Sequence, residues 1–327
     1  MRKKIIIGII VSLLLIFLSF MKVDFSKLEY TLKNANYFML IPIFFLVVIS
    51  MYFRALRWRI LIAPIKKIRI QPLFSASSIG LMFNNLLPAR IGEIVRAWLI
   101  GNEENISKSS VIATIVVERV FDGITALIVL TVVQLLYPFT IPPNLRIALY
   151  ILVSASILIV VYFFYSRDSD YSEIKGLNLL LRLIPKIARD KVYSLIVSFR
   201  EGLKILSNAT DILKTIIISF AVWIPIIVII YLSIESVGIN ISIFASIVTF
   251  VILSFGLMIP SAPGFIGTIQ YSFIIALNIF RISNDGAIAA SVMYHIGTFI
   301  SINILGIFFV LKSDVKIGNI RKFLNKS

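Results

Sequence analysis

The sequence predicts an all-α protein that crosses a membrane several times, with two re-entrant or broken helices arranged as an inverted-topology repeat. The first observation is composition: of 327 residues, 59% are hydrophobic and 15% are charged, and the mean hydropathy is +0.99. A soluble domain has a far more polar balance. The second is a series of long apolar runs, and the third is a pair of similar segments, each interrupted by proline and glycine.

The positions of the basic residues along the chain decide what the strong positive charge means. The chain has 32 Lys and Arg against 16 Asp and Glu, a formal net charge of +16. Basic residues of membrane proteins gather in cytoplasmic loops, so we expect no nucleic-acid partner. The chain has no cysteine and one histidine, which excludes thiolate chemistry and sites built from several histidines. No P-loop or zinc-protease motif is present, and we expect neither a metal nor a cofactor.

The first part of the chain predicts two spans and a basic loop. Residues 5–20 follow three basic residues and are interpreted as a retained first helix, because no small-residue cleavage site follows. Residues 21–36 have mixed charge and indicate a short external connection before a second span at 37–53. The next basic residues predict a cytoplasmic loop, with capture of anionic headgroups as the alternative. They are Arg54, Arg57, Arg59, Lys66, Lys67 and Arg69.

Residues 73–100 contain an interrupted segment. Its centre, residues 83–97, has the sequence F-N-N-L-L-P-A-R-I-G-E-I-V-R-A. Polar backbone and charge at membrane depth must be buried in protein or line a wet cavity. We therefore expect a re-entrant or broken helix at a substrate site.

The remaining chain alternates spans with short connections. The basic segment 167–211 indicates a cytoplasmic connection with an amphipathic helix. Residues 241–259 and 265–280 flank a break at 260–264 and form either a re-entrant hairpin or two full spans. Basic residues at both ends place both termini in the cytoplasm. The further long spans are 111–137, 147–165, 212–234 with a kink at Pro225, and 287–311.

The two interrupted segments resemble each other. S-I-G-L-M at 78–82 recurs as S-F-G-L-M at 254–258, and P-A-R-I-G at 88–92 corresponds to P-G-F-I-G at 263–267. Three predicted spans separate them, so the second copy is inverted. The single transmembrane domain, 1–327, then comprises half 1 (37–137), the connection 167–211 and half 2 (212–311). Interrupted helices at matching positions of inverted halves indicate a transport site near the membrane midplane.

Three motifs carry a family resemblance: N-N-L-L-P-A-R-I-G-E-I-V-R-A at 84–97, V-E-R-V-F-D-G at 117–123 and P-S-A-P-G-F-I-G at 260–267. Together they resemble the transmembrane region of bacterial lysylphosphatidylglycerol synthases, where this region acts as a lipid flippase, and its stand-alone relatives. Some relatives are linked to polyprenyl-lipid glycosylation. The soluble lysyl-transferring domain is not found in this sequence, so the resemblance implies lipid transport and gives no ground for assigning aminoacyl transfer, and it does not identify the lipid.

Charged residues of the first motif are the leading site candidates. Arg90, Glu93 and Arg96 are spaced three apart and predict an alternating charge ladder on a helix. Guanidinium groups suit phosphate oxygens, so the functional hypothesis is that Arg90 and Arg96 bind a lipid phosphate while Glu93 holds them. The structural alternative is an ion-pair cluster that joins the hairpin to its neighbours.

A second group of charges lies in the span 111–137. Glu118 and Asp122 are four apart and share a helix face, and Arg119 is adjacent. In one hypothesis Arg119 meets the phosphate and the carboxylates pair with Arg90 or Arg96. In the other, Glu118 or Asp122 couples transport to protons.

Uncharged residues and the histidine complete the candidate site. His295 corresponds to Arg119 in the repeat alignment and either lines the cavity or packs as a hydrogen-bonded core group. Asn84 and Asn85 either donate to a headgroup or cap a broken helix. At the second break the candidate substrate-binding residues are Pro263, Gly264 and Gly267. The glycines are also explained by a backbone conformation that other residues avoid, or by close approach of another backbone segment.

These observations predict a flippase or secondary transporter in the cytoplasmic membrane. Its cargo would be an anionic, phosphate-bearing lipid, either a phospholipid or a polyprenyl-phosphate-linked lipid. One alternative is a membrane-embedded lipid-modifying transferase with Glu118 or Asp122 as general base. Another is an accessory subunit of a lipid glycosylation pathway. The expected partners are membrane lipids, with a homo-oligomer or a separate glycosyltransferase or other lipid-modifying enzyme as further options.

Overall fold

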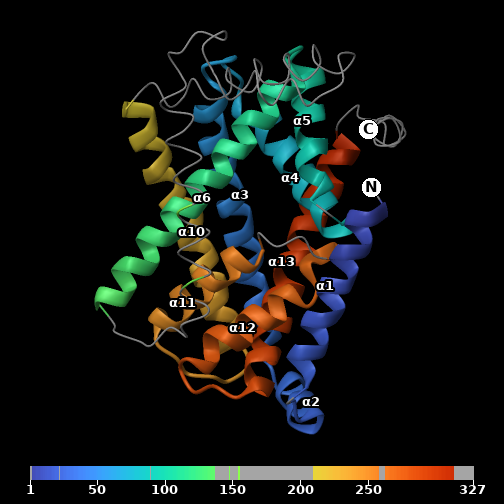
Figure 1. Ribbon diagram of the computed structural model, residues 1–327, viewed down its shortest axis with the longest axis vertical. Helices are drawn as coiled ribbons and strands as arrows, with labels where there is room; N and C mark the ends of the chain where they lie inside the picture. Colours follow the sequence, from blue (N-terminus) through green and yellow to red (C-terminus); the bar gives the residue numbers. More distant parts are fainter. Residues whose placement is uncertain are drawn as a thin grey trace.

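The computed structural model describes residues 2–21, 23–88, 90–136, 147, 154, 209–257 and 262–312, and every regular element in these parts is a helix (Figure 1). The expected all-α membrane architecture is confirmed. Nearly all of the predicted 147–165 span and of the 167–211 connection, and the basic residues after 312, lie outside the described residues.

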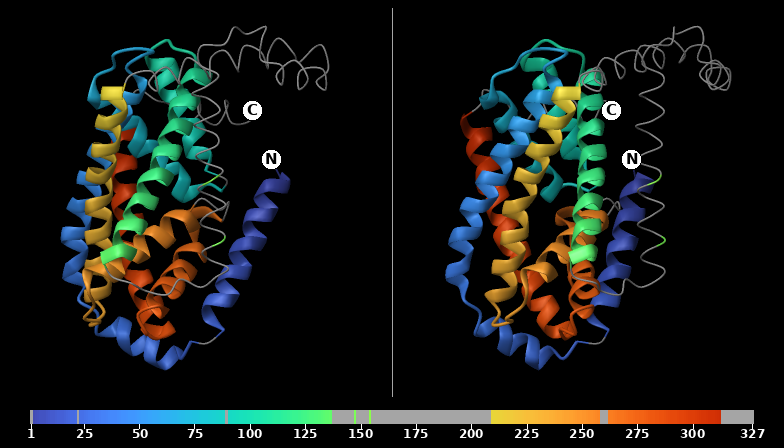
Figure 2. Two further views of the ribbon diagram at one scale, coloured as in Figure 1. Left: turned by 60° about the vertical axis from the view of Figure 1, so that its left-hand side comes forward. Right: turned by 90° about the vertical axis from the view of Figure 1, so that its left-hand side faces the viewer.

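Long helices form the frame of the molecule. By length and composition, three described segments can cross a membrane: Tyr37–Ile62, Ala209–Glu235 and Asn284–Lys312. They contain α3 (Leu40–Ile62), α10 (Ala209–Glu235) and α13 (Asn284–Lys312), and α6 (Lys108–Leu136) is of similar length. Helices α3 and α10 lie side by side (Figure 2).

Two pairs of shorter helices occupy opposite ends of this frame (Figure 1). One pair is α4 (Ile70–Leu86) and α5 (Ile91–Glu103), and the other is α11 (Ile243–Gly256) and α12 (Thr268–Asn278). At about 1.5 Å per residue the longest of the four, α4, extends about 26 Å. That is shorter than a hydrocarbon core of about 30 Å, so none of them crosses it alone when upright.

Helix breaks occur at both motifs. The first break follows Leu86 and ends at Ile91, and the second lies between Gly256 and Thr268, where η3 (Pro263–Phe265) is a single short turn. The partners of each pair pack against each other. Re-entrant membrane insertion and the inverted repeat stay predictions.

The expectation of a basic loop starting at Arg54 was wrong. Helix α3 continues to Ile62, so Arg54, Arg57 and Arg59 belong to a helix and not to the predicted basic loop. The physical reason is that Arg57 finds buried acidic partners on α6. The connection 21–36 contains a short helix, α2 (Phe25–Lys33), which is capped by the Asp24 carboxylate accepting from two backbone amides.

Helix α1 (Arg2–Phe20) packs against α12 at a glycine. Gly267 has φ +86°, and a Cβ there would lie 2.7 Å from the carbonyl oxygen of Ser12. The Ser12 hydroxyl in turn accepts a 2.7 Å hydrogen bond from the Ala262 amide. Gly267 therefore permits the close approach of α1 to the second break.

Replacing Gly267 by Ala is expected to destabilise the protein by about 1–3 kcal/mol, because the new methyl group collides with the backbone of α1. Equilibrium unfolding in mixed micelles measures the loss. Gly238→Ala is the matched control, because Gly238 also has positive φ (+75°) but no atom within 4 Å of the added Cβ. Equal losses in both variants would mean that backbone conformation, and not contact with α1, accounts for Gly267.

Candidate functional site

Glu118 on α6 is the centre of a buried charge cluster. Its side chain is fully buried, and three arginines hydrogen-bond to it. The Oε2 atom lies 2.7 Å from Arg96 Nη2, and the Oε1 atom lies 3.1 Å from Arg57 Nη2 and 3.2 Å from Arg119 Nη2. The expected pairing of Glu118 with Arg96 across the hairpin is thus present.

Asp122, one turn further along α6, shares two of these arginines. Its Oδ1 atom lies 2.7 Å from Arg57 Nη1, and its Oδ2 atom lies 2.9 Å from Arg119 Nη1. Arg57 also donates to the Ser219 hydroxyl on α10, at 3.0 Å. Arg57 is fully buried, and such a charge is tolerated only when it is paired and hydrogen-bonded. The cluster therefore joins α3, α5, α6 and α10.

The predicted charge ladder is only partly formed. Glu93 Oε1 lies 3.4 Å from Arg90 Nη1, but its other contact is Arg119 Nε, also at 3.4 Å, and not Arg96. Arg96 is buried, and its guanidinium carbon lies 3.7 Å from the centre of the Trp58 ring. This stacking and the bond to Glu118 turn Arg96 away from Glu93. Direct contact of Arg96 with a phosphate stays an untested prediction that this arrangement disfavours.

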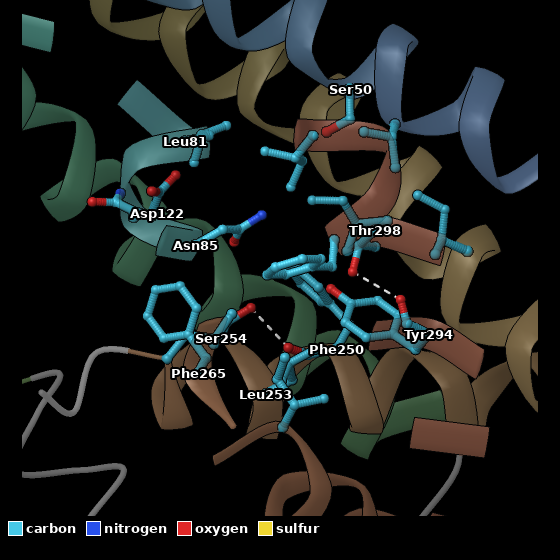
Figure 3. A pocket seen from close by; sticks show the side chains of 18 of the residues that line it. Ser50, Leu81, Asn85, Asp122, Phe250, Leu253, Ser254, Phe265, Tyr294 and Thr298 are labelled. Atoms are coloured by element: carbon cyan, nitrogen blue, oxygen red, sulfur yellow. Dashed lines mark hydrogen bonds between the residues drawn. The ribbon is translucent and has the colours of Figure 1, made fainter. Parts of the chain in front are cut away.

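A cavity of about 190 Å³ lies where the two breaks meet α3, α6, α10 and α13 (Figure 3). Of the twelve candidate residues, eight line it: Asn84, Asn85, Arg90, Glu93, Arg119, Asp122, Gly264 and His295. The other four, Arg96, Glu118, Pro263 and Gly267, are not among the lining residues. The structure thus brings together most of the predicted set around one space.

Arg90 connects the two breaks. Its backbone is left-handed (φ 55°, ψ 36°) at the N-cap of α5, a conformation that costs a non-glycine residue about 1–2 kcal/mol. Its Nη2 atom donates to the carbonyl of Leu257, just after α11, and its guanidinium carbon lies 5.9 Å from the centre of the Phe265 ring. The strained backbone is therefore offset by contacts with the second helix pair.

His295 faces the cavity from α13. Its Nδ1 atom lies 3.3 Å from Gln270 Nε2, and the Gln270 Oε1 atom accepts a 2.8 Å bond from the Gly267 amide. A Cβ on Gly264 would lie 3.7 Å from His295 Nε2 and 3.5 Å from the Asn85 carbonyl oxygen. His295 thus lines the cavity and also lies beside Gln270, so both alternatives considered for it are present, and a role in substrate binding stays a prediction. A methyl group would fit at Gly264, so its positive φ (+68°) accounts for the glycine.

Sequence reasoning missed Arg54 and Arg57. Arg54 lines the cavity, with its Nη1 atom 4.0 Å from Glu118 Oε1, beyond hydrogen-bond range, and its guanidinium carbon 5.2 Å from the centre of the Trp223 ring. The available signal was spacing: two arginines three apart at the end of one span complement two carboxylates four apart in another.

A comparison with known proteins identifies the family. Residues 5–306 match the family described as the lysylphosphatidylglycerol synthase TM region. The chain belongs to this family. A UPF0104 membrane protein of Methanothermobacter thermautotrophicus is 26% identical over 301 residues, covering 86% of this chain and 87% of that protein. A second UPF0104 membrane protein, from Methanocaldococcus jannaschii, is 23% identical over 241 residues, covering 72% of this chain and 96% of that protein. No solved structure matches the chain.

Membership in the lysylphosphatidylglycerol synthase TM-region family confirms the resemblance drawn from three motifs. Each motif supplies lining residues to the cavity: Asn85 and Arg90 come from the first, Arg119 and Asp122 from the second, and Gly264 from the third. In the described residues no group of three or more His, Asp or Glu side chains is placed to hold a metal ion. The polar residues that line the cavity offer charge and hydrogen bonding from guanidinium, carboxylate and amide groups.

Proposed function

We propose that this protein is a flippase that moves an anionic, phosphate-bearing lipid across the cytoplasmic membrane. The observation that carries the proposal is the excess of positive charge at the cavity. Within the described part of the chain, five guanidinium groups meet three carboxylates in one connected cluster, an excess of two positive charges. The arginines are Arg54, Arg57, Arg90, Arg96 and Arg119.

An anion would be stabilised in this cavity for a physical reason. Unbalanced charge at membrane depth is costly and is characteristic of substrate pathways. Arg54 and Arg90 have the weakest carboxylate contacts of the five, at 4.0 and 3.4 Å, and both line the cavity. A guanidinium fork matches phosphate oxygens well. The excess charge is therefore available where a headgroup would enter.

The remaining charged residues hold the lining residues of the proposed site in position. Arg57 and Arg96 are buried against Glu118, and Arg57 also holds Asp122. These contacts orient Arg119, which reaches the cavity from α6. The lipid chain would remain in the bilayer while the two halves expose the cavity to alternate sides, as the predicted inverted repeat implies.

Lipid translocation in proteoliposomes tests the proposal. Phosphatidic acid with a fluorescent label on one acyl chain is reduced by dithionite when it reaches the outer leaflet, and the wild-type protein should accelerate this loss over empty liposomes. The Arg54→Gln, Arg90→Gln double variant should slow it by roughly tenfold or more, as expected when about 1.4 kcal/mol of binding is removed. Arg59→Gln, at an exposed position on the same helix α3, is the control.

An unchanged rate in a correctly folded double variant would contradict the proposal. Mass spectrometry of the same lipids separates transport from the alternative of lipid modification. A flippase leaves their masses unchanged, whereas a transferase supplied with its donor generates new species. An accessory role in lipid glycosylation would instead be indicated by co-purification with a glycosyltransferase and by tolerance of both substitutions.

A further inference from the structure

We infer that the headgroup bound in this cavity is a phosphate monoester, whose terminal phosphate carries up to two negative charges, and not a phosphodiester. The inference rests on the proposed function, because it assumes that the lipid headgroup occupies the cavity. It narrows the substrate class to a lipid that ends in an unsubstituted phosphate. Charge, hydrogen bonding and the apolar part of the lining each support it.

The charge balance favours a dianion. Five guanidinium groups and three carboxylates leave two positive charges unmatched among the described residues. A monoester phosphate carries about −1.5 to −2 at neutral pH, which compensates nearly the whole excess. A phosphodiester carries a single charge and would leave one guanidinium uncompensated away from bulk water.

The lining hydroxyl groups are already engaged with the backbone. Ser50 donates to the carbonyl of Val222 at 3.1 Å, Ser254 to that of Phe250 at 2.7 Å, and Thr298 to that of Tyr294 at 2.8 Å. The last two of these bonds are drawn in Figure 3. The carboxylates of Glu93 and Asp122 are likewise taken by arginines. The protons of these hydroxyl groups are therefore not free for a headgroup, although the hydroxyl oxygens and Asn84 Oδ1 can still accept hydrogen bonds.

Unpaired donors, by contrast, remain at the cavity. Asn85 Nδ2 and Arg90 Nε are buried atoms with no hydrogen-bond partner in the described part of the chain. Both residues line the cavity, and the Asn85 side chain projects into it (Figure 3). A buried donor left without a partner costs about 1–3 kcal/mol. A bare phosphate is rich in acceptors and donates little, so it satisfies such donors better than glycerol or sugar substituents do.

Part of the cavity lining is apolar. Met51, Leu253, Phe255 and Ile269 are buried hydrophobic residues that line it. This surface suits the first carbons of a hydrocarbon chain. It gives no partner to a second polar substituent on the phosphate, and a cationic headgroup would be repelled by the arginines. The cavity thus offers both charged groups for a phosphate and apolar surface for hydrocarbon.

A matched pair of lipids tests the inference on the wild-type protein. Dioleoyl phosphatidic acid and its methyl ester, dioleoyl phosphatidylmethanol, differ by one methyl group and one negative charge. We expect the protein in detergent micelles near neutral pH to bind phosphatidic acid about tenfold or more tightly, measured by native mass spectrometry. A third arm with polyprenyl monophosphate distinguishes an isoprenoid from a glycerolipid source of the same phosphate.

Substituted variants test whether the preference for phosphatidic acid over its methyl ester arises at the cavity. Arg54→Gln should reduce the ratio of the two affinities severalfold, while Arg59→Gln should leave it unchanged; unfolding curves verify that each variant is folded. Equal binding of the two lipids, tighter binding of the methyl ester, or no binding of either would overturn the inference. If proteoliposomes translocate both lipids equally, the monoester inference fails and the flippase proposal stands. If no anionic lipid moves, the flippase proposal itself fails.

Discussion

Replacing Glu118 by Gln is expected to lower the free energy of unfolding by about 3–5 kcal/mol, the usual cost of removing one partner from a buried ion pair. The carboxylate is fully buried and hydrogen-bonds to Arg57, Arg96 and Arg119. Glutamine preserves the size of the side chain but raises the excess of positive charge in the cluster from two to three. Equilibrium unfolding in mixed micelles, followed by circular dichroism, measures the effect.

A surface carboxylate provides the matched control. Glu29 on α2 is 66% exposed and pairs with Lys33 at 2.6 Å, so Glu29→Gln should cost less than about 1 kcal/mol. The double variant Glu118→Gln, Arg96→Gln should recover part of the loss, because it removes one of the charges left unpaired. A loss at Glu118 as small as that at Glu29 would show that the cluster contributes little to stability.

Replacing Gly92 by Ala is expected to destabilise the protein by about 3 kcal/mol through overpacking of the first helix pair. The added methyl group would collide with the carbonyl oxygen of Gly80 on α4 and lie 2.6 Å from Asn84 Oδ1. Backbone cannot yield by changing rotamer, so α5 must move away from α4. Arg96, four residues further along α5, would then be pulled from Glu118.

Asn102→Ala controls for helix propensity in this experiment. Asn102 is exposed on the same helix α5, and both substitutions introduce a better helix former. Only Gly92→Ala inserts a methyl group between two helices. A neutral or stabilising effect at Gly92 in the unfolding assay would contradict the close packing of α4 and α5.

Local signals were sufficient to predict the helix breaks. The prolines and glycines near residues 88 and 263 predicted interruptions, and α4 ends at Leu86 and α11 at Gly256. Charge at membrane depth predicted a cavity lining, and Arg90, Glu93, Arg119 and Asp122 do line one. These predictions succeeded because backbone conformation and the cost of isolated charge depend on nearby sequence.

Long-range pairing was predicted only in part: the pairing of Glu118 with Arg96 was expected, and that of Arg57 was not. Arg57 was assigned to a cytoplasmic loop because arginines after an apolar run usually mark its end. It is instead buried, because Asp122, 65 positions later, lies 2.7 Å away. Arg96 was predicted either to bind a phosphate or to pair with the carboxylates of the 111–137 span, and no local pattern indicated that it stacks on Trp58. The full compensation between distant charges becomes visible only when the helices are placed.

The Arg90 guanidinium donates to two acceptors, the Glu93 carboxylate and the Leu257 carbonyl. Its Nη2 donates to the Leu257 carbonyl at the end of α11, where a cation is electrostatically favoured. A headgroup that binds at the unpaired Nε and draws the guanidinium further into the cavity weakens the bond from Nη2 to that carbonyl. Under the proposed function, binding of a headgroup in the cavity then weakens the contact between the two helix pairs. By thermodynamic linkage, a tighter contact between the helix pairs likewise weakens headgroup binding.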